Sequence, residues 1–254
     1  MAGASDKTFS SGFRYTFGLL GPGQDYFKDL LEGASTLKPR PSRVAIVAAD
    51  QSIHVEIAEG ARREAEQLGF EVVGFYPFGK KEDLAALARK LKTRNPDLIL
   101  FSSYFQDAAP FVQAAKATGL DAGMLALAIA PSQPEFITQL GRDADYLYGV
   151  AQWLPSLPYH GPVFGSPANY AALYRRRFAH EPDYHAAAAS AAGVAYQLAL
   201  TRAGSLDRES IRDALAALDA MTFYGRIHFD DRGMNVSNPV TAFQIQKGKQ
   251  VALW

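Results

Sequence analysis

Aromatic and histidine side chains follow several short apolar runs in this sequence, and these residue types suit the binding of a small molecule. Tyr104 comes directly after the apolar run at 97–102, and Trp153 follows the run at 146–150. His54 lies one short loop beyond an earlier run. If the runs are parallel strands, their carboxyl ends meet at one edge of a sheet, where ligands bind in open α/β folds. The spacing therefore predicts that these three side chains share a rim beside a pocket.

The motifs that would support catalysis or a metal are weak or missing. The sequence has no Gly-x-Ser-x-Gly elbow, and Ser102-Ser103 lacks the glycines that such a turn needs. The glycine-rich stretch at 18–23 has Pro22 where a nucleotide loop needs a backbone N–H. His180 and His185 are wrongly spaced for one helix face, and the chain has no cysteine to supply thiolates or disulfides. We therefore expect no catalytic residue, no metal and no cofactor.

The elements that must position the rim residues alternate between strand and helix. Short runs of β-branched and aliphatic residues predict strands at 43–48, 70–75, 97–102, 124–128 and 146–150. Amphipathic stretches between them predict helices at 54–69, 82–92, 107–118 and 134–140. Strand–helix–strand order with short connections indicates right-handed crossovers. The predicted fold class is therefore α/β, with a doubly wound parallel sheet that helices cover on both faces.

The last third of the chain has a different pattern. A stretch rich in Pro, Gly and aromatic residues at 152–167 predicts an irregular connection. Helices are expected after it at 166–179, 185–203 and 207–218, followed by short strands at 225–229, 240–246 and 250–253. A run of helices before a strand meander indicates that the chain leaves one lobe and later returns to it.

Composition excludes several classes of protein. The 26 Lys and Arg residues balance 26 Asp and Glu residues, so the chain lacks the excess positive charge that nucleic-acid binding needs. The densest basic cluster is Arg175–Arg177, which we interpret as one solvated helix edge. The 254-residue chain is 48% hydrophobic and 20% charged, which is typical of a globular protein. No apolar run reaches the length of a membrane span.

Several stretches resemble the type I periplasmic solute-binding proteins of the branched-chain amino acid (leucine/isoleucine/valine-binding-like) ABC transporter class. The most specific are Ala58–Arg62, Gln152–Tyr159, Glu181–Ala187, Ala214–Leu218 and Phe223–Asp230 with Gly233. The resemblance implies a non-catalytic protein of two α/β lobes that close on a small solute, amino acid-like or an aromatic acid, and present it to an ABC permease. It also implies a periplasmic location, although residues 1–7 do not have the pattern of a signal peptide.

The resemblance assigns ligand-binding roles to residues by position. Ala4 and Ser5 match a loop whose backbone and hydroxyl groups hold a ligand carboxylate. Tyr104 matches a pocket residue. Tyr184 matches the aromatic residue at the start of a helix that lines the cleft. These residues are therefore expected to contact the solute.

Three more positions bear on the kind of ligand. Ile53 and His54 fall where members of the family often have an aromatic and a small residue facing the ligand. Ile129 stands where the amino acid binders place an acidic residue that holds the ligand ammonium. A buried ammonium without a partner is costly. The ligand is therefore expected to be uncharged or purely acidic, and aromatic, with its ring near Trp153 and Tyr104.

The chain is short by comparison with this family, whose members begin with several βα units before the loop that matches Ala4 and Ser5. We therefore expect a truncated form that lacks most of the N-terminal lobe. The expected division is one complete ligand-binding lobe at 14–165 and 222–254, with a mainly helical remnant of the other at 1–13 and 166–221. Whether such a chain binds its ligand is left open.

The expected truncation has a consequence for association. The helix at 185–203 would expose an apolar stripe that includes Ala188, Ala191 and Ala195. An exposed apolar patch favours a homodimer, unless the helices pack back onto the complete lobe. Two other functions stay open beside solute delivery. They are a ligand-sensing regulatory module of the same fold and a flavodoxin-like enzyme, which the lack of a phosphate loop and of paired acid and base residues disfavours.

Overall fold

The computed structural model describes residues 5–253, and the chain divides into two compact units. Unit 1 comprises residues 1–22 and 152–239, and unit 2 comprises residues 23–151 and 240–254. The chain therefore passes from one unit to the other after Pro22, after Ala151 and after Pro239. Within residues 5–253, no helix combines the length and the apolar character that crossing a membrane requires.

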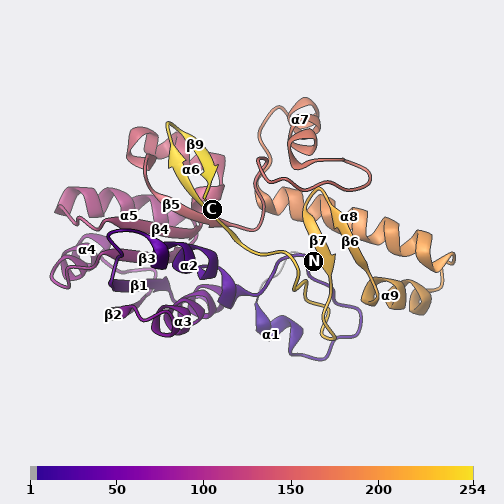
Figure 1. Cartoon of the computed structure of the whole chain (residues 1–254), viewed down its shortest axis with the longest axis horizontal. Coiled ribbons are helices and arrows are strands. Elements are labelled where there is room, and N and C mark those ends of the chain that lie inside the picture. The colour runs from indigo at the N-terminus through magenta and orange to yellow at the C-terminus, as the bar shows by residue number, and fades with distance from the viewer. Residues whose placement is uncertain (1–4, 254) are drawn as a thin grey trace. The chain divides into compact units, whose positions relative to one another are not determined.

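Unit 2 is built on a seven-stranded sheet with the strand order β2-β1-β3-β4-β5-β8-β9 (Figure 1). Its strands are β1 (Arg43–Ala49), β2 (Glu71–Phe78), β3 (Leu98–Ser103), β4 (Met124–Ile129), β5 (Tyr148–Ala151), β8 (Thr241–Gln246) and β9 (Lys249–Ala252). Strands β1 to β5 pair in parallel, whereas β8 and β9 extend the sheet beyond β5 as antiparallel strands. This sheet confirms the predicted α/β fold class.

Helices cover both faces of the sheet. They are η1 (Gly23–Asp25), α2 (Lys28–Thr36), α3 (Ser52–Gln67), α4 (Leu84–Lys92), α5 (Phe105–Thr118), η2 (Ala130–Ser132), α6 (Pro134–Leu140) and η3 (Gly141–Ala144). The chain moves from β1 outward to β2 and then across to β3, so right-handed crossovers place α3 on one face and α4 to α6 on the other. The contacts agree, because α2 packs beside α3, and α5 packs beside both α4 and α6 (Figure 1).

The central strands are buried along nearly their whole length because both of their faces are covered, and apart from Ser102 and Ser103 at the end of β3 the buried positions of β1 and β3 are apolar. Strand β1 is buried from Val44 to Ala49, and β3 is buried throughout. Such strands have continuous hydrophobic sequences instead of alternating ones, which is why the apolar runs predicted them. Helix α3 requires glycine at position 60, because a Cβ there would lie 2.0 Å from the backbone oxygen of Gln24. This close approach lets α3 pack against η1.

Asp97, directly before β3, joins the starts of two neighbouring strands. Its Oδ2 accepts hydrogen bonds from the backbone N–H groups of Ser42 (2.8 Å) and Arg43 (2.9 Å), and from the Ser42 hydroxyl (3.0 Å). The N–H of Ser42 contributes most to holding the pKa of this carboxyl below its ordinary value of 3.8. The carboxylate thereby fixes the entry of β1 into the sheet.

Replacing Asp97 with alanine is expected to lower the free energy of unfolding by about 1–2 kcal/mol, because these donors lose a charged acceptor at a partly exposed site. The stabilisation is present above the ordinary carboxyl pKa and is lost as the pH falls below it, since the folded pKa is the lower one. Urea denaturation at neutral pH measures the effect. Asp121→Ala, at an exposed position, is the control and should change stability by less than about 0.5 kcal/mol. Equal losses in the two variants would contradict the prediction.

Unit 1 combines a short helix, three longer helices and a two-stranded hairpin among its described residues. The elements are α1 (Asp6–Phe9), α7 (Pro167–Phe178), α8 (Tyr184–Ala203), α9 (Arg208–Ala216), β6 (Asp219–Thr222) and β7 (Gly225–His228). A side-chain oxygen caps each longer helix: Ser166 accepts from Asn169 N, Asp183 from Ala186 N and Asp207 from Ser210 N. These caps satisfy backbone donors that the first turn leaves free.

An aromatic core fills unit 1. The ring of Tyr170 on α7 stacks on Phe223 with centroids 4.3 Å apart, and the indole of Trp153 meets Tyr170 edge-on at 5.6 Å. The Trp153 N–H donates to the Phe223 carbonyl (3.0 Å), so its one polar group is satisfied inside the core. Phe164 packs edge-on against both Tyr170 and Phe223. The connection that precedes α7 therefore belongs to the core of this unit.

Gln152 links the residues at which the chain enters and leaves unit 1, through its side-chain amide and its backbone carbonyl. It accepts from the Gly21 N–H (2.8 Å) and donates to the Gly21 carbonyl (3.3 Å). Its own backbone carbonyl accepts from the Asn238 side chain (3.0 Å). All three residues lie next to a point where the chain leaves or enters unit 1. One buried glutamine therefore joins all three crossings at their unit 1 ends.

The observed division differs from the predicted one, which places 14–22, 152–165 and 222–239 in the larger lobe. These segments belong to unit 1. The physical reason is packing, since Trp153 and Phe164 join the aromatic core beside α7, and β7 pairs with β6. The structure also differs from the expectation that helix α8 exposes an apolar stripe.

The stripe on α8 that is expected to be exposed is buried within the chain. Ala188, Ala191 and Ala195 are each no more than 1% exposed. Helix α8 packs beside α9, and the Tyr170 hydroxyl donates to the Ala186 carbonyl (3.1 Å) from α7. A homodimer stays a prediction, but it would need a surface other than this stripe.

Candidate ligand site

The point where the strand order reverses in unit 2 brings two sequence-predicted residues together. The order β2-β1-β3 means that the chain leaves β1 toward one side and β3 toward the other. The loops after β1 and β3 therefore diverge at the carboxyl ends of the strands, which is where such sheets bind ligands. His54 lies in the first turn of α3, and Tyr104 is the residue between β3 and α5. Their rings meet edge to face at 4.4 Å.

His54 is fully buried, whereas its partner ring is accessible. The His54 Nδ1 lies 3.0 Å from the Ser102 hydroxyl, at the end of β3. Burial lowers the pKa of His54 from 6.5 to about 4, so the imidazole is neutral at pH 7. The side chain of Tyr104 is 44% exposed. The phenol ring of Tyr104 is therefore accessible, and the neutral imidazole of His54 packs against it from the protein interior.

Two polar atoms near this pair are buried without a hydrogen-bond partner among the described residues. They are the His54 Nε2 and the Oε1 of Gln51, the residue that precedes α3. A buried polar atom that makes no hydrogen bond costs about 1–3 kcal/mol. A polar group of a bound solute that reached these atoms would recover that cost, which makes this corner a candidate binding site.

Ile129, at the end of β4, is held in a strained conformation beside the same corner. Its φ and ψ are 67° and −66°, a region that a β-branched residue rarely adopts. The Ser132 hydroxyl donates to the Ile129 carbonyl (2.6 Å) and fixes this turn. In the ladder, Ile129 pairs with Ser103, the neighbour of Tyr104. A strained backbone conformation of this kind costs about 1–3 kcal/mol, and such conformations are found most often at functional sites. Ile53 adjoins His54 on α3 and is half-buried.

The other predicted ligand residues lie in unit 1 or outside the described residues. Trp153 is expected on a rim with Tyr104, but its ring is 2% exposed in the aromatic core of unit 1, where its N–H finds a partner. Tyr184 opens α8, is 1% exposed and stacks on His185 at 4.0 Å. Ala4 lies outside the described residues. Ligand roles for these residues stay predictions.

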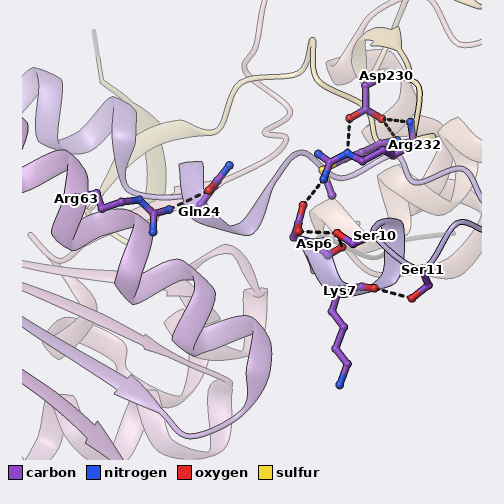
Figure 2. Close-up of polar contacts among 9 residues, drawn as sticks. Asp6, Lys7, Ser10, Ser11, Gln24, Arg63, Asp230 and Arg232 are labelled. Atoms are coloured by element: carbon purple, nitrogen blue, oxygen red, sulfur yellow. Dashed lines mark hydrogen bonds and ion pairs between the residues drawn. The ribbon is translucent and has the colours of Figure 1, made fainter.

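Ser5, the last of the predicted residues, is the N-cap residue of α1 and is half-buried. A chain of charges anchors this short helix (Figure 2). Arg232 bridges two carboxylates, with its Nη1 2.6 Å from Asp6 Oδ1 and its Nε 3.2 Å from Asp230 Oδ2. The Ser10 hydroxyl and Arg232 both lower the pKa of Asp6, the hydroxyl more strongly. The ion pairs thus fix the start of α1 to the turn after β7.

Sequence reasoning missed Gln51 and the part that Ser102 plays. As nucleophiles, Ser102 and Ser103 lack the glycine-flanked turn, and their types alone do not indicate a structural part. Both are fully buried polar residues at the end of an otherwise apolar strand. Buried serines at the carboxyl end of a central strand are the signal that could have identified them. Across residues 5–253, no group of three His, Asp or Glu side chains could hold a metal ion.

The fold defines a class: an α/β protein with a candidate small-molecule site at the switch point of its sheet. The chain belongs to the periplasmic binding protein family, whose model matches residues 2–250. This is a family of non-catalytic binding proteins, so the flavodoxin-like enzyme is set aside.

Several solved structures share this fold. A leucine binding protein from Thermotoga maritima superposes with a TM-score of 0.82 at 18% identity, covering 98% of this chain and 70% of that one. A branched-chain amino acid binding protein from Streptococcus pneumoniae, in complex with isoleucine, gives 0.81 at 20% identity with the same coverage. A solute binding protein from R. palustris, in complex with benzoate, gives 0.77 at 16% identity and covers 93% of this chain and 64% of that one. At these identities the likeness establishes the fold.

Proposed function

We propose that this chain binds a small organic solute that is uncharged or acidic where it meets unit 2. The observation that carries the proposal is the corner of His54 and Tyr104 at the β1/β3 switch point, with two buried polar atoms that lack partners. The accessible phenol ring suits an aromatic or apolar body, and the buried nitrogen and amide oxygen suit a polar group on it. Delivery of the solute to an ABC permease in the periplasm, by closure of two lobes, is family behaviour that the proposal extends to this chain.

The chemistry of the corner argues against an amino acid. The residues that form it are uncharged at pH 7: Gln51, His54, Ser102, Ser103, Tyr104 and Ile129. An α-ammonium held against them would lose its hydration without gaining a counter-ion, which is costly. The carboxylate of an aromatic acid can instead accept a hydrogen bond from His54 when Nδ1 accepts from the Ser102 hydroxyl and Nε2 carries the ring proton. The similar R. palustris protein binds benzoate. Benzoate is therefore the first probe, with isoleucine as the comparison.

Titration calorimetry with each compound tests the solute class. We expect benzoate to bind and isoleucine to bind far more weakly or not at all. Tight binding of isoleucine or leucine would show that the uncharged corner is not the ligand-facing surface. A rise in melting temperature that follows the concentration of benzoate provides an independent readout, because a ligand that binds only the folded chain stabilises it.

Replacing Tyr104 with alanine is expected to weaken benzoate binding by about tenfold or more, because a stacked aromatic contact of about 1–2 kcal/mol is lost. Melting temperature should change little, since the side chain is 44% exposed. Tyr146→Ala removes another tyrosine of unit 2, 73% exposed, and is the matched control. Tyr104→Phe retains the ring and should bind nearly as well as the parent. Unchanged affinity in Tyr104→Ala would remove this residue from the site.

A further inference from the structure

The C-terminal end of α7 carries a group of aromatic and basic side chains, here named the α7 cluster, all of them exposed except the half-buried Tyr174: Tyr174, Arg175, Arg176, Arg177, Phe178 and His180. Three of its rings gather at the helix end. The Tyr174 ring lies 4.6 Å from Phe178 and 5.3 Å from His180, measured between centroids. Phe178 is 53% exposed. An apolar ring pair is thus held at the surface beside three guanidinium groups.

Two of the three positive charges are uncompensated. Arg175 pairs with Glu181 at 2.8 Å. Arg176 and Arg177 form no ion pair with any other residue of the range 5–253. The guanidinium of Arg177 lies 5.7 Å from the Phe178 ring. In a chain whose formal charge is zero, this end of α7 is a local positive surface.

Apart from Tyr174, whose half-buried ring lies 5.9 Å from Tyr170 between centroids, the cluster contributes little to the packing of α7. The buried face of the helix is formed by Pro167, Tyr170 and Ala171, one to two turns earlier. Residues 175–180 are all exposed. Solvation of a basic helix edge would explain the arginines. It would not explain why aromatic rings lie beside an exposed phenylalanine. The combination of Arg with Tyr and Phe is instead the composition of energetic centres in protein interfaces.

We propose that the α7 cluster docks an acidic segment of a partner polypeptide that carries an apolar anchor residue. Carboxylates of the partner would pair with Arg176 and Arg177, whose planar guanidinium groups match them bidentately. The anchor would cover Phe178. A membrane surface fits less well, because the apolar stripe of α7 faces the interior of unit 1. Nucleic acid fits less well because two free guanidinium groups neutralise too few phosphates. The proposal is independent of the solute site.

The test uses a short synthetic peptide of Asp and Glu with a central Leu-Phe pair, and its counterpart with Asn and Gln in place of the acids. Binding to the full chain is followed by fluorescence anisotropy at low and at physiological salt. We expect the acidic peptide to bind and the amide peptide not to bind. Binding of the acidic peptide should be weaker at physiological salt than at low salt. R176E/R177E should weaken binding about tenfold or more, and Phe178→Ala several-fold.

Matched controls separate a docking site from general attraction of opposite charges. K80E/K81E reverses two adjacent exposed lysines in unit 2 and changes the net charge equally. Leu206→Ala removes an apolar side chain that is 88% exposed. Both should bind as the parent does, with melting temperatures of all variants unchanged. The proposal is overturned if K80E/K81E weakens binding equally, if the amide peptide binds as well, or if the acidic peptide does not bind at low salt. It is also overturned if phosphatidylglycerol vesicles or a DNA oligonucleotide bind in its place with the same dependence on Arg176 and Arg177.

Discussion

Replacing Asn235 with leucine is expected to lower the free energy of unfolding of unit 1 by about 4 kcal/mol or more. This fully buried amide joins three segments. Its Nδ2 donates to the carbonyls of Leu19 (3.2 Å) and Arg226 (3.3 Å). Its Oδ1 accepts from the N–H groups of His228 (3.1 Å) and Ser237 (3.3 Å). Leucine has the same branched shape and is somewhat larger, so the loss would come from buried backbone groups left without partners and from overpacking, and not from a cavity.

Urea denaturation followed by the fluorescence of Trp153 measures this effect, since that indole is buried in the core of unit 1. A Trp254→Phe background leaves Trp153 as the sole tryptophan. Val236→Ala, at the adjacent position that is 50% exposed, should cost no more than about 0.5 kcal/mol. Asn235→Asp retains the acceptor but loses both donated bonds, so it should be strongly destabilised as well. A leucine variant within about 1 kcal/mol of the parent would show that the amide is not a structural centre of unit 1.

Acidification from pH 7 to pH 4 is expected to cost unit 2 roughly 3 kcal/mol through His54 alone. Burial lowers the folded pKa of this imidazole from 6.5 to about 4. The unfolded chain therefore takes up the proton first as the pH falls. The stability that the neutral ring contributes is complete above pH 6.5 and is lost progressively down to about pH 4. The carboxylates with lowered pKa values, such as Asp97, lose their contributions mostly below this window.

The comparison that isolates His54 is the difference in unfolding free energy between the parent and His54→Phe, measured by urea denaturation across this pH range. His54→Phe keeps an aromatic ring against Tyr104 and cannot titrate. It is expected to be less stable at pH 7, because Ser102 loses its partner, but to lose roughly 3 kcal/mol less on acidification. His180→Asn, which removes an exposed histidine, should follow the parent. Parallel pH profiles for the parent and His54→Phe would mean that His54 titrates normally in the folded state.

The sheet of unit 2 was predictable because burial on both faces leaves a direct mark on the sequence. Strand β1 was expected at 43–48 and extends from Arg43 to Ala49, and α6 has the expected bounds. Strand β6 was missed, because Asp219–Thr222 has exposed and half-buried positions and follows a helix with no turn signal between them. Strand β6 forms only through pairing with β7 in a separate two-stranded sheet, and no local pattern reveals that pairing.

The candidate site was predictable only in part. Position at the ends of neighbouring parallel strands was enough to identify His54 and Tyr104, because parallel order follows from the alternation of strands and helices. Trp153 has the same kind of position in the sequence, yet its indole is buried against Tyr170 and Phe223, which come from distant segments. The buried amides of Gln152 and Asn235 were missed for the same reason, since their partners lie far away along the chain.

The sheet of unit 2 cannot be completed in the order in which a ribosome makes it. Strand β5 ends at Ala151, but β8, its antiparallel neighbour, begins only at Thr241. The three longer helices of unit 1 (α7 to α9) and its hairpin are synthesised in the interval. Until β8 is available, β5 presents an open row of backbone donors and acceptors, which is a template for pairing with other chains. Nascent molecules should therefore aggregate most readily at this stage, and a chain that stops before residue 241 should remain in that vulnerable state permanently.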